Sequence, residues 1–277
     1  MLRGFYTAAA GMLAQQRKTE MLTNNMANAQ TPGFKTDTAA QRAFPEMLLR
    51  RYEELSVPTE NTLHLTQSRA IGSVNTGVYL QETIPKFLQG DLRETGLTTD
   101  LALLDVNIPQ NENGVRGALF FTVQNPDGEI RYTRNGNFAL DGAGFLTTAS
   151  GMYVLDTEGN PIQLESDQFI VNDAGLLTGI NGEQAQVGIA YANNPQDLIK
   201  EGDGLYRLDG GALVNGYTAE NVQFRLQQGY LEQSNVDVSK TMTQMLAAYR
   251  SFEANQKVLQ AYDRSMEKAV NDIGRIN

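Results

Sequence analysis

Apolar side chains recur at helical spacing along the first 26 residues of the chain. Their steps of 3, 4 and 3 over residues 2–12 place them on one face of a helix, and two later positions continue that face. The interface positions predicted for this helix are Leu2, Phe5, Ala9, Met12, Leu22 and Met26. The pattern ends at Thr31, Pro32 and Gly33, because proline disfavours helix at the preceding residue and glycine tolerates left-handed backbone.

A longer apolar stripe runs along residues 238–273, where steps of 4 and 3 alternate as in a heptad repeat. Its apolar members are Val238, Met242, Met245, Tyr249, Phe252, Leu259, Met266, Val270 and Ile273, and Gln256 and Asp263 are polar members. Ser234 or Asn235 is predicted to cap this helix, with Asp237 in the first turn. A second stripe widens the face toward the C-terminus, so one partner helix would cover only part of it.

Between the two helical patterns the sequence changes to short apolar or β-branched runs, such as residues 119–123, 152–155 and 169–171. Turn signals of the NPDG, NG and DGAG kind separate these runs at intervals of roughly 8–12 residues. Short strands with such turns are typical of an antiparallel sandwich or a barrel-like domain. The predicted fold class is therefore α+β, with helices at the two termini and a central antiparallel β domain.

A local repeat lies inside this β region. FALDGAGFLTTASG, residues 138–151, aligns without gaps to FIVNDAGLLTGING, residues 169–182. Each copy predicts one hairpin, with a glycine turn between two strands, and two stacked hairpins would form one continuous β core.

Residues 36–75 show the weakest pattern of the chain. The stretch AFPEMLLRRYEELS, residues 43–56, predicts a short helix after Pro45. The remainder, which includes His64, is polar, and we expect it to be ordered only in contact with neighbours.

Charge is distributed unevenly over the 277 residues. Residues 1–60 and 236–277 together carry 13 basic and 11 acidic side chains, which leaves 9 basic and 21 acidic side chains for residues 61–235. A middle region with a net charge of −12 repels phosphates, so nucleic acid is not an expected partner. The nearly neutral ends are able to pack against each other or against copies of the chain without strong repulsion.

The sequence lacks a recognisable catalytic or metal-binding pattern. It has no cysteine, which excludes disulfides and thiolate metal sites, and its one histidine, His64, has no partner at zinc or nucleophile spacing. The DGAG and NDAG turns lack the alternating acids of a calcium loop. We expect no catalytic, cofactor or metal site. We also expect no membrane insertion, since no segment approaches ~18 apolar residues, and no cleaved signal peptide.

Motifs at both ends resemble those of the bacterial flagellar axial family of rod and hook proteins. The N-terminal motif is NNMANAQTPGFK, with Asn24, Asn25, Ala27, Asn28, Thr31, Pro32, Gly33, Phe34 and Lys35 as its assembly residues. The C-terminal motif matches at Gly229, Leu231, Glu232, Ser234, Asn235, Val236, Asp237, Met242, Arg250, Phe252, Glu253, Ala254, Asn255 and Lys257. Residues 89–96, 100–102 and 132–146 resemble inner motifs of the family, in the expected order.

The resemblance implies that the N- and C-terminal helices pair as a coiled-coil-like axial domain. This discontinuous domain comprises residues 1–75 and 229–277, and the central β domain of residues 76–228 lies outside it. It further implies a subunit of the basal-body rod, most like the distal rod type, that polymerises into a hollow helical shaft, transmits torque and passes exported subunits. The implied partners are copies of itself, other rod and hook proteins, and the flagellar type III export apparatus. The implied location is the basal body, reached without a cleaved signal. Phe34 and Lys35 are expected to contact an adjacent subunit.

Three alternatives stay open at the level of sequence. The first is a hook or hook-junction protein of the same family. The second is an adhesin or fibre protein that carries the β domain on a coiled-coil stalk, in which identical C-terminal helices would pair with one another. The third is a hydrolase of cell-wall glycan, because any two of the 32 acidic residues might converge, although the absence of Trp weakens a sugar-stacking cleft.

Overall fold

The computed structural model describes residues 2–57, 63–112 and 114–273. The chain divides into two compact units. The helical unit comprises residues 1–24, 38–84 and 239–277, and the β unit comprises residues 25–37 and 85–238. These boundaries differ from the predicted ones, because residues 25–37 and 229–238 belong with the β unit and residues 76–84 belong with the helical unit. The predicted α+β class, with terminal helices and a mostly antiparallel β body, is confirmed.

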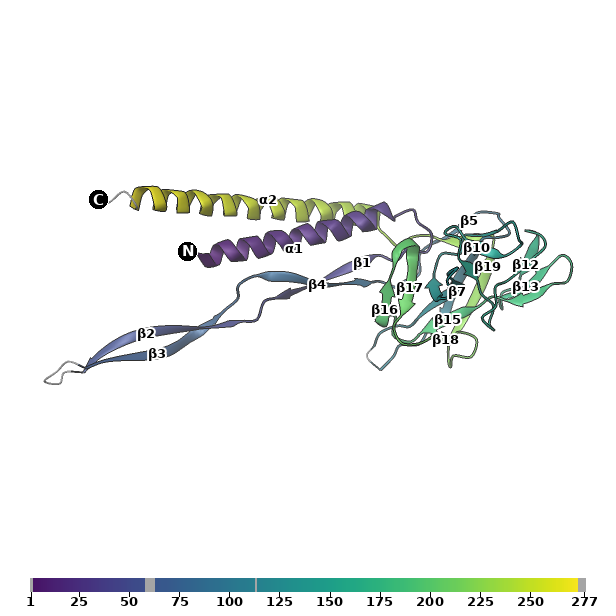
Figure 1. Cartoon of the computed structure of the whole chain (residues 1–277), viewed down its shortest axis with the longest axis horizontal. Helices are drawn as coiled ribbons and strands as arrows, with labels where there is room; N and C mark the ends of the chain where they lie inside the picture. Colours follow the sequence, from purple (N-terminus) through teal and green to yellow (C-terminus); the bar gives the residue numbers. More distant parts are fainter. Residues whose placement is uncertain (1, 58–62, 113, 274–277) are drawn as a thin grey trace. The chain divides into compact units, whose positions relative to one another are not determined.

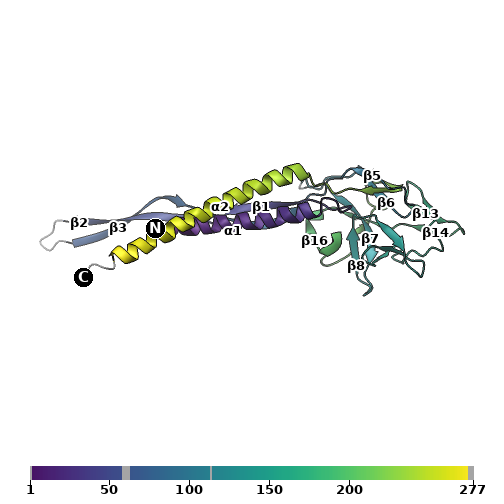
Figure 2. The same ribbon diagram turned by 90° about the horizontal axis from the view of Figure 1, so that it is seen from above.

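The helical unit contains the two long helices. Helix α1 spans Leu2–Ala27, and helix α2 spans Val238–Lys268 and continues as a π-helical turn over Ala269–Ile273. Figures 1 and 2 show α1 and α2 running alongside each other in opposite chain directions. None of the helices in the described residues is long and apolar enough to cross a membrane.

Four strands accompany the helices. Strand β1 (Asp37–Ala43) pairs with β4 (Val78–Pro85), and β2 (Met47–Val57) pairs antiparallel with β3 (Leu63–Val74). The prediction of a short helix after Pro45 is therefore wrong. The spacing of Leu48, Tyr52 and Leu55 imitates a helical face, but pairing with β3 along the whole strand decides the conformation.

The β unit is built from short antiparallel strands. They are β5 (Leu92–Glu94), β6 (Leu101–Asn107), β7 (Ala118–Gln124), β8 (Ile130–Thr133), β9 (Phe138–Leu140), β10 (Leu146–Thr148), β11 (Tyr153–Val154), β12 (Phe169–Val171), β13 (Leu176–Gly179), β14 (Gln184–Gln186), β15 (Ile189–Ala192), β16 (Leu198–Lys200), β17 (Leu205–Leu208), β18 (Val214–Asn215), β19 (Gln223–Gln228) and β20 (Tyr230–Glu232). Nine strands form one sheet, whose main path runs β16-β17-β8-β7-β11-β10-β9, with β15 on β7 and β18 on β15. Strands β12-β13-β14 form a second sheet, and β19 with β6 and β20 with β5 form pairs.

The predicted repeat is a pair of equivalent hairpins. In β9–β10, Thr147 lies opposite Ala139, and in β12–β13 the aligned Thr178 lies opposite Ile170, so the two registers are the same. The aligned turn glycines, Gly144 and Gly175, both have positive φ, which an L side chain rarely adopts. Although the hairpins belong to different sheets, their aligned apolar side chains pack into one core, as predicted. These are Phe138, Leu146, Phe169 and Leu177.

Candidate functional site

Four charged side chains meet in the interior of the β unit. Lys35 Nζ lies 2.6 Å from Glu232 Oε1, and Arg134 Nε lies 2.6 Å from Glu232 Oε2. Arg134 Nη2 lies 2.8 Å from Asp105 Oδ1. Each of the four side chains is at most 6% exposed. We call these residues the charge cluster; it joins the N-terminal and C-terminal motifs through an arginine of the β unit.

Backbone groups satisfy the remaining hydrogen-bonding capacity of the cluster. Lys35 Nζ donates to the carbonyl of Leu88 at 2.8 Å, and the Gly90 amide donates to Glu232 Oε1 at 2.8 Å. The guanidinium of Arg134 donates to two main-chain carbonyls at 2.8 Å, those of residues 103 and 119. Because buried charges are costly unless they are paired and hydrogen-bonded, this full set of partners is what allows the cluster to stay ionised.

Gly33 shows how closely the N-terminal motif lies against this cluster. Its amide donates to the backbone carbonyl of Glu232 at 2.8 Å, and its φ is +70°. A Cβ at this position would lie 2.5 Å from the backbone carbonyl carbon of Arg134. The turn therefore requires glycine for two reasons, its left-handed backbone and the close approach of residue 134.

The cluster shifts the pKa values of Lys35 and Glu232. Burial, together with the nearby Arg134 charge, lowers the pKa of Lys35 from 10.5 to about 8, although Glu232 opposes the shift. For Glu232, burial alone would raise the pKa, but the charges of Arg134 and Lys35 hold it below its usual value. At neutral pH Glu232 is thus a carboxylate between two cationic side chains.

We expect the pKa of Lys35 to appear in the pH dependence of stability. Between about pH 8 and 10.5 the unfolded chain holds a proton on this amine that the folded chain lacks. Raising the pH across this window therefore increases the unfolding free energy, by at most about 1.4 kcal/mol per pH unit. Denaturant unfolding of the wild type and of Lys35→Met should give a free-energy difference that rises across this window. A difference that is flat or falls with pH would contradict the assignment.

Two asparagines of the signature motifs bind backbone instead of solvent. Asn25 exchanges two hydrogen bonds with the backbone of Asp37, at 2.9 and 3.0 Å. Asn235 Oδ1 accepts from the Thr36 amide at 2.7 Å, and its Nδ2 donates to the carbonyls of Lys86 and Leu88. The prediction that Asn235 caps α2 is therefore wrong, because its side chain is used here and α2 begins only at Val238.

Phe34 and Lys35 are not available to an adjacent subunit, contrary to the expectation from sequence. Phe34 is 5% exposed, and Lys200 Nζ lies 4.0 Å from its ring centroid. Lys35 is 2% exposed and lies in the charge cluster. The motif lysine and aromatic therefore hold the N-terminal segment in the β unit. Sequence alone offers no sign of this, because a lysine after a turn is usually a solvated side chain.

Other residues of the two motifs lie nearer the surface. Asn28, Thr31, Pro32, Ser234 and Asn255 are half-buried, and Asn24, Ala27, Asp237, Arg250 and Glu253 are exposed. Sequence analysis named Glu232 only as a motif match and overlooked Arg134 and Asp105. The available signal was an arginine directly before the NG turn signal at 135–136 in an acidic region, but its partners cannot be identified from sequence.

The predicted helix-interface residues divide between two faces. Leu22 is buried, and Phe5, Ala9, Met12, Met26, Met245, Phe252, Leu259 and Met266 are half-buried. Val238, Met242, Tyr249 and Val270 are exposed, and the side chains of Leu2 and Ile273 lie outside the described ones. Two glycines of α1 mark its contact with α2, since a Cβ at Gly4 would meet the Tyr262 hydroxyl and one at Gly11 would lie 3.0 Å from Asn255 Nδ2.

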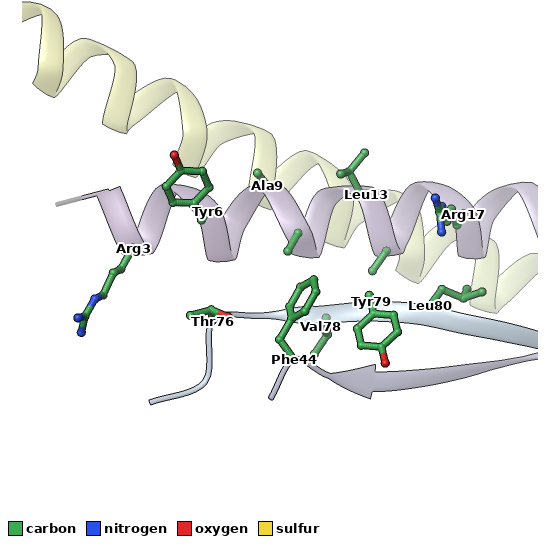
Figure 3. A pocket seen from close by; sticks show the side chains of 12 residues that line it. Arg3, Tyr6, Ala9, Leu13, Arg17, Phe44, Thr76, Val78, Tyr79 and Leu80 are labelled. Atoms are coloured by element: carbon green, nitrogen blue, oxygen red, sulfur yellow. The ribbon is translucent and has the colours of Figure 1, made fainter. Parts of the chain in front are cut away.

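A groove with a volume of about 530 Å³ runs beside α1 in the helical unit. Figure 3 shows α1 on one side of it, with Ala9 and Leu13. On the other side lie Phe44, which follows β1, and Val78 and Tyr79 of β4. Its lining is mainly apolar. The sequence did not predict this groove, because the residues opposite α1 lie in or directly after residues 36–75, where the pattern is weakest.

Models of three protein families match the chain at its ends and middle. The flagella basal body rod protein model matches residues 5–35, and the flagellar hook protein FlgE/F/G D1 domain model matches residues 114–205. The flagellar basal body rod FlgEFG protein C-terminal model matches residues 227–272. The first and third of these matches contain the N-terminal and C-terminal motifs.

Relatives align over nearly the whole chain. A flagellar hook-basal body complex protein, FlhO of Bacillus subtilis, is 45% identical over 278 residues that cover 100% of both chains. The flagellar basal-body rod protein FlgG of Borreliella burgdorferi is 31% identical and covers 98% of each chain. FlgG of Bacillus subtilis is also 31% identical, over 98% of this chain and 99% of its own. The chain therefore belongs to the flagellar basal-body rod and hook family, whose members are structural proteins and not enzymes.

Proposed function

We propose that this protein is a structural subunit of the flagellar rod and that it polymerises through its terminal helices into a hollow helical shaft. Such a shaft transmits torque and passes exported subunits, and the subunit reaches it through the flagellar type III apparatus without a cleaved signal. Other rod and hook proteins are its neighbours at either end. The names of the FlgG relatives, which are basal-body rod proteins, support the rod assignment. We place the subunit at the distal part of the rod, as the resemblance of its length and single middle domain suggests.

The observation that carries the proposal is the amount of apolar side chain that both helices leave exposed. Tyr6 and Leu13 on α1 and Met242, Leu246 and Tyr249 on α2 are each more than half exposed. Contiguous exposed apolar surface of this kind marks an interaction site. Contacts that repeat from copy to copy without closing a ring produce an open helical polymer, which is what a shaft requires.

Pairing of α1 with α2 as a coiled-coil-like layer is the second part of the proposal. The half-buried positions Met245, Phe252 and Leu259 of α2 recur at intervals of seven residues, as heptad packing requires. Tyr262 and Asn255, which approach glycines of α1, are seven residues apart as well.

Phe252→Asp is expected to abolish incorporation of the protein into the shaft, because it places a charge on the face of α2 that packs on α1. The β unit should stay folded, since residue 252 lies outside it. Ala261→Asp, which adds the same charge at an exposed position of α2, is the matched control and should still assemble. Motility and fractionation of basal bodies from complemented deletion cells measure both variants. Wild-type assembly of Phe252→Asp would refute the helix-pairing part of the proposal.

A second candidate position is the hook end, favoured by the name of the 45% identical relative, a hook-basal body complex protein. Electron microscopy of a deletion strain separates the two candidates. If the protein belongs to the rod, its deletion leaves a flagellar structure that ends within the rod. A protein of the hook end leaves a complete rod without a normal hook. An unaltered flagellum would overturn both assignments.

A further inference from the structure

We propose that the groove beside α1 receives the exposed apolar stripe of α2 from a second copy of this chain. The α2 stripe is defined here as Met242, Leu246 and Tyr249. The inference rests on the proposed polymerisation and names the two surfaces that meet in it. Both surfaces belong to the helical unit, so every copy carries one of each.

Three small side chains leave room on the α1 side of the groove, between the larger Tyr6 and Leu13 that also line it. Ala9, Ala10 and Ala14 line it, and Phe44 and Val78 line the strand side (Figure 3). An apolar hollow of about 530 Å³ has room for several large side chains of a partner. Filling it with apolar side chains removes that surface from water, which is the main driving force of protein association.

The α2 stripe has the form that such a groove accommodates. Its members are 56%, 52% and 53% exposed, and they follow one another at steps of 4 and 3, which places them on one side of the helix. They are exposed in the chain by itself, so its own groove does not hold them. A helix that lays an apolar face into a groove through anchors at this spacing is a recurrent mode of recognition.

Charges at the ends of the two surfaces define the direction of docking. Arg3 and Arg17 lie at the two ends of the groove lining, about 21 Å apart along α1 at 1.5 Å per residue. Glu253 follows the stripe and is exposed, about 16 Å along α2 from Met242. The stripe and its terminal carboxylate thus fit between the two arginines, and the carboxylate is placed to pair with one of them.

The symmetry of a helical polymer selects which arginine that is. Rotation and translation about an axis that runs along the helices preserve the direction of each helix. The α2 helix of a neighbouring copy therefore runs antiparallel to α1, as α2 does within one chain (Figure 1). In that orientation the C-terminal end of the stripe points toward the start of α1, which places Glu253 of the neighbour beside Arg3.

Cysteine cross-linking tests the contact directly, because the chain contains no cysteine of its own. Purified full-length Ala10→Cys is mixed with full-length Leu246→Cys that carries a size tag, polymerised, and oxidised. With one cysteine in each chain, a disulfide between the two variants is necessarily intermolecular, and it requires Cα atoms about 4.4–6.8 Å apart. We expect a heterodimer band at least about tenfold stronger than in the control mixture of Ala10→Cys with Ala261→Cys, whose thiol is also exposed but lies about 22 Å farther along α2.

The possible outcomes separate this inference from the proposed function. Polymers that form but give no more heterodimer with Leu246→Cys than with Ala261→Cys overturn the groove contact and leave polymerisation intact. Failure of the wild-type full-length chain to polymerise overturns both. The predicted direction has its own test, in which Arg3→Glu and Glu253→Arg each reduce polymer yield and the combined variant restores it. The combined variant is then not restored, and Arg17→Glu restores the polymer yield of Glu253→Arg, if the direction of docking is the reverse of the one proposed.

Discussion

Replacement of Arg134 by methionine is expected to lower the unfolding free energy of the β unit by about 3–5 kcal/mol. Methionine fills a similar length of the interior but supplies no charge and no N–H donor. The side chains of Glu232 and Asp105 are 1% and 6% exposed. Without Arg134, Lys35 is the only counter-charge left in the cluster for these two side chains. Two main-chain carbonyls lose their donor in the same step. Each of these buried groups retains its desolvation cost without compensation.

Arg131→Met is the matched control for this prediction. Arg131 lies three residues away, on β8, and forms ion pairs with Glu129 and Glu201, whose side chains are 62% and 32% exposed. Exposed pairs of this kind contribute about 0–1 kcal/mol, so the variant is expected to unfold close to the wild type. Urea unfolding of the full-length protein, followed by circular dichroism and tyrosine fluorescence, measures both. Equal losses for the two variants would show that the cluster is not the principal electrostatic stabiliser of the unit.

The charge cluster also gives the two signature motifs a structural explanation. Lys35 belongs to the N-terminal motif and Glu232 to the C-terminal motif, and both ends of the chain reach the β unit through them. Asn235 reinforces this junction by binding the backbone at Thr36. Lys35 and Glu232 thus lie in the interior of the β unit, and the large apolar side chains that α1 and α2 leave exposed lie elsewhere.

Features that depend on local sequence patterns were predictable from the sequence. The terminal helices follow from apolar spacing within each segment, and the hairpins at 138–151 and 169–182 follow from their turn glycines and shared pattern. Residues 43–56 show the limit of such reasoning. Their apolar spacing fits a helix, and only pairing with β3 selects an extended conformation.

The candidate site was less predictable because it depends on partners remote in sequence. Lys35 and Glu232 are 197 residues apart in the chain, and no local pattern connects them. Helix faces present a related difficulty. The periodicity of α2 identifies apolar positions, but it does not say which of them pack within the chain, as Phe252 does, and which stay exposed, as Tyr249 does. That division depends on where α1 lies, which is a property of the folded unit.

Amide hydrogen exchange of the two terminal helices is expected to differ more between free monomer and polymer than the exchange of any other part of the chain. Within the described residues, the buried apolar side chains of α1 are Ala8, Ala14 and Leu22, and the buried residues of α2 are Thr241 and Ala248. Helices with so little burial are held mainly by their own backbone hydrogen bonds, which are marginal in water for isolated segments. We therefore expect weak protection of both helices in the monomer, and an increase of about 10³-fold in the polymer, where neighbours cover their apolar faces.

Strand β7 provides the internal reference for that measurement. Its side chains at residues 118–121 are buried, and both of its edges are paired, so its amides should exchange slowly in monomer and polymer alike. The same experiment on Phe252→Asp should leave β7 protected while the helices stay unprotected under polymerising conditions. Terminal helices as strongly protected as β7 in the free monomer would mean that the helical unit is stable without neighbours. Polymerisation would then have to draw its free energy from surfaces outside the helices.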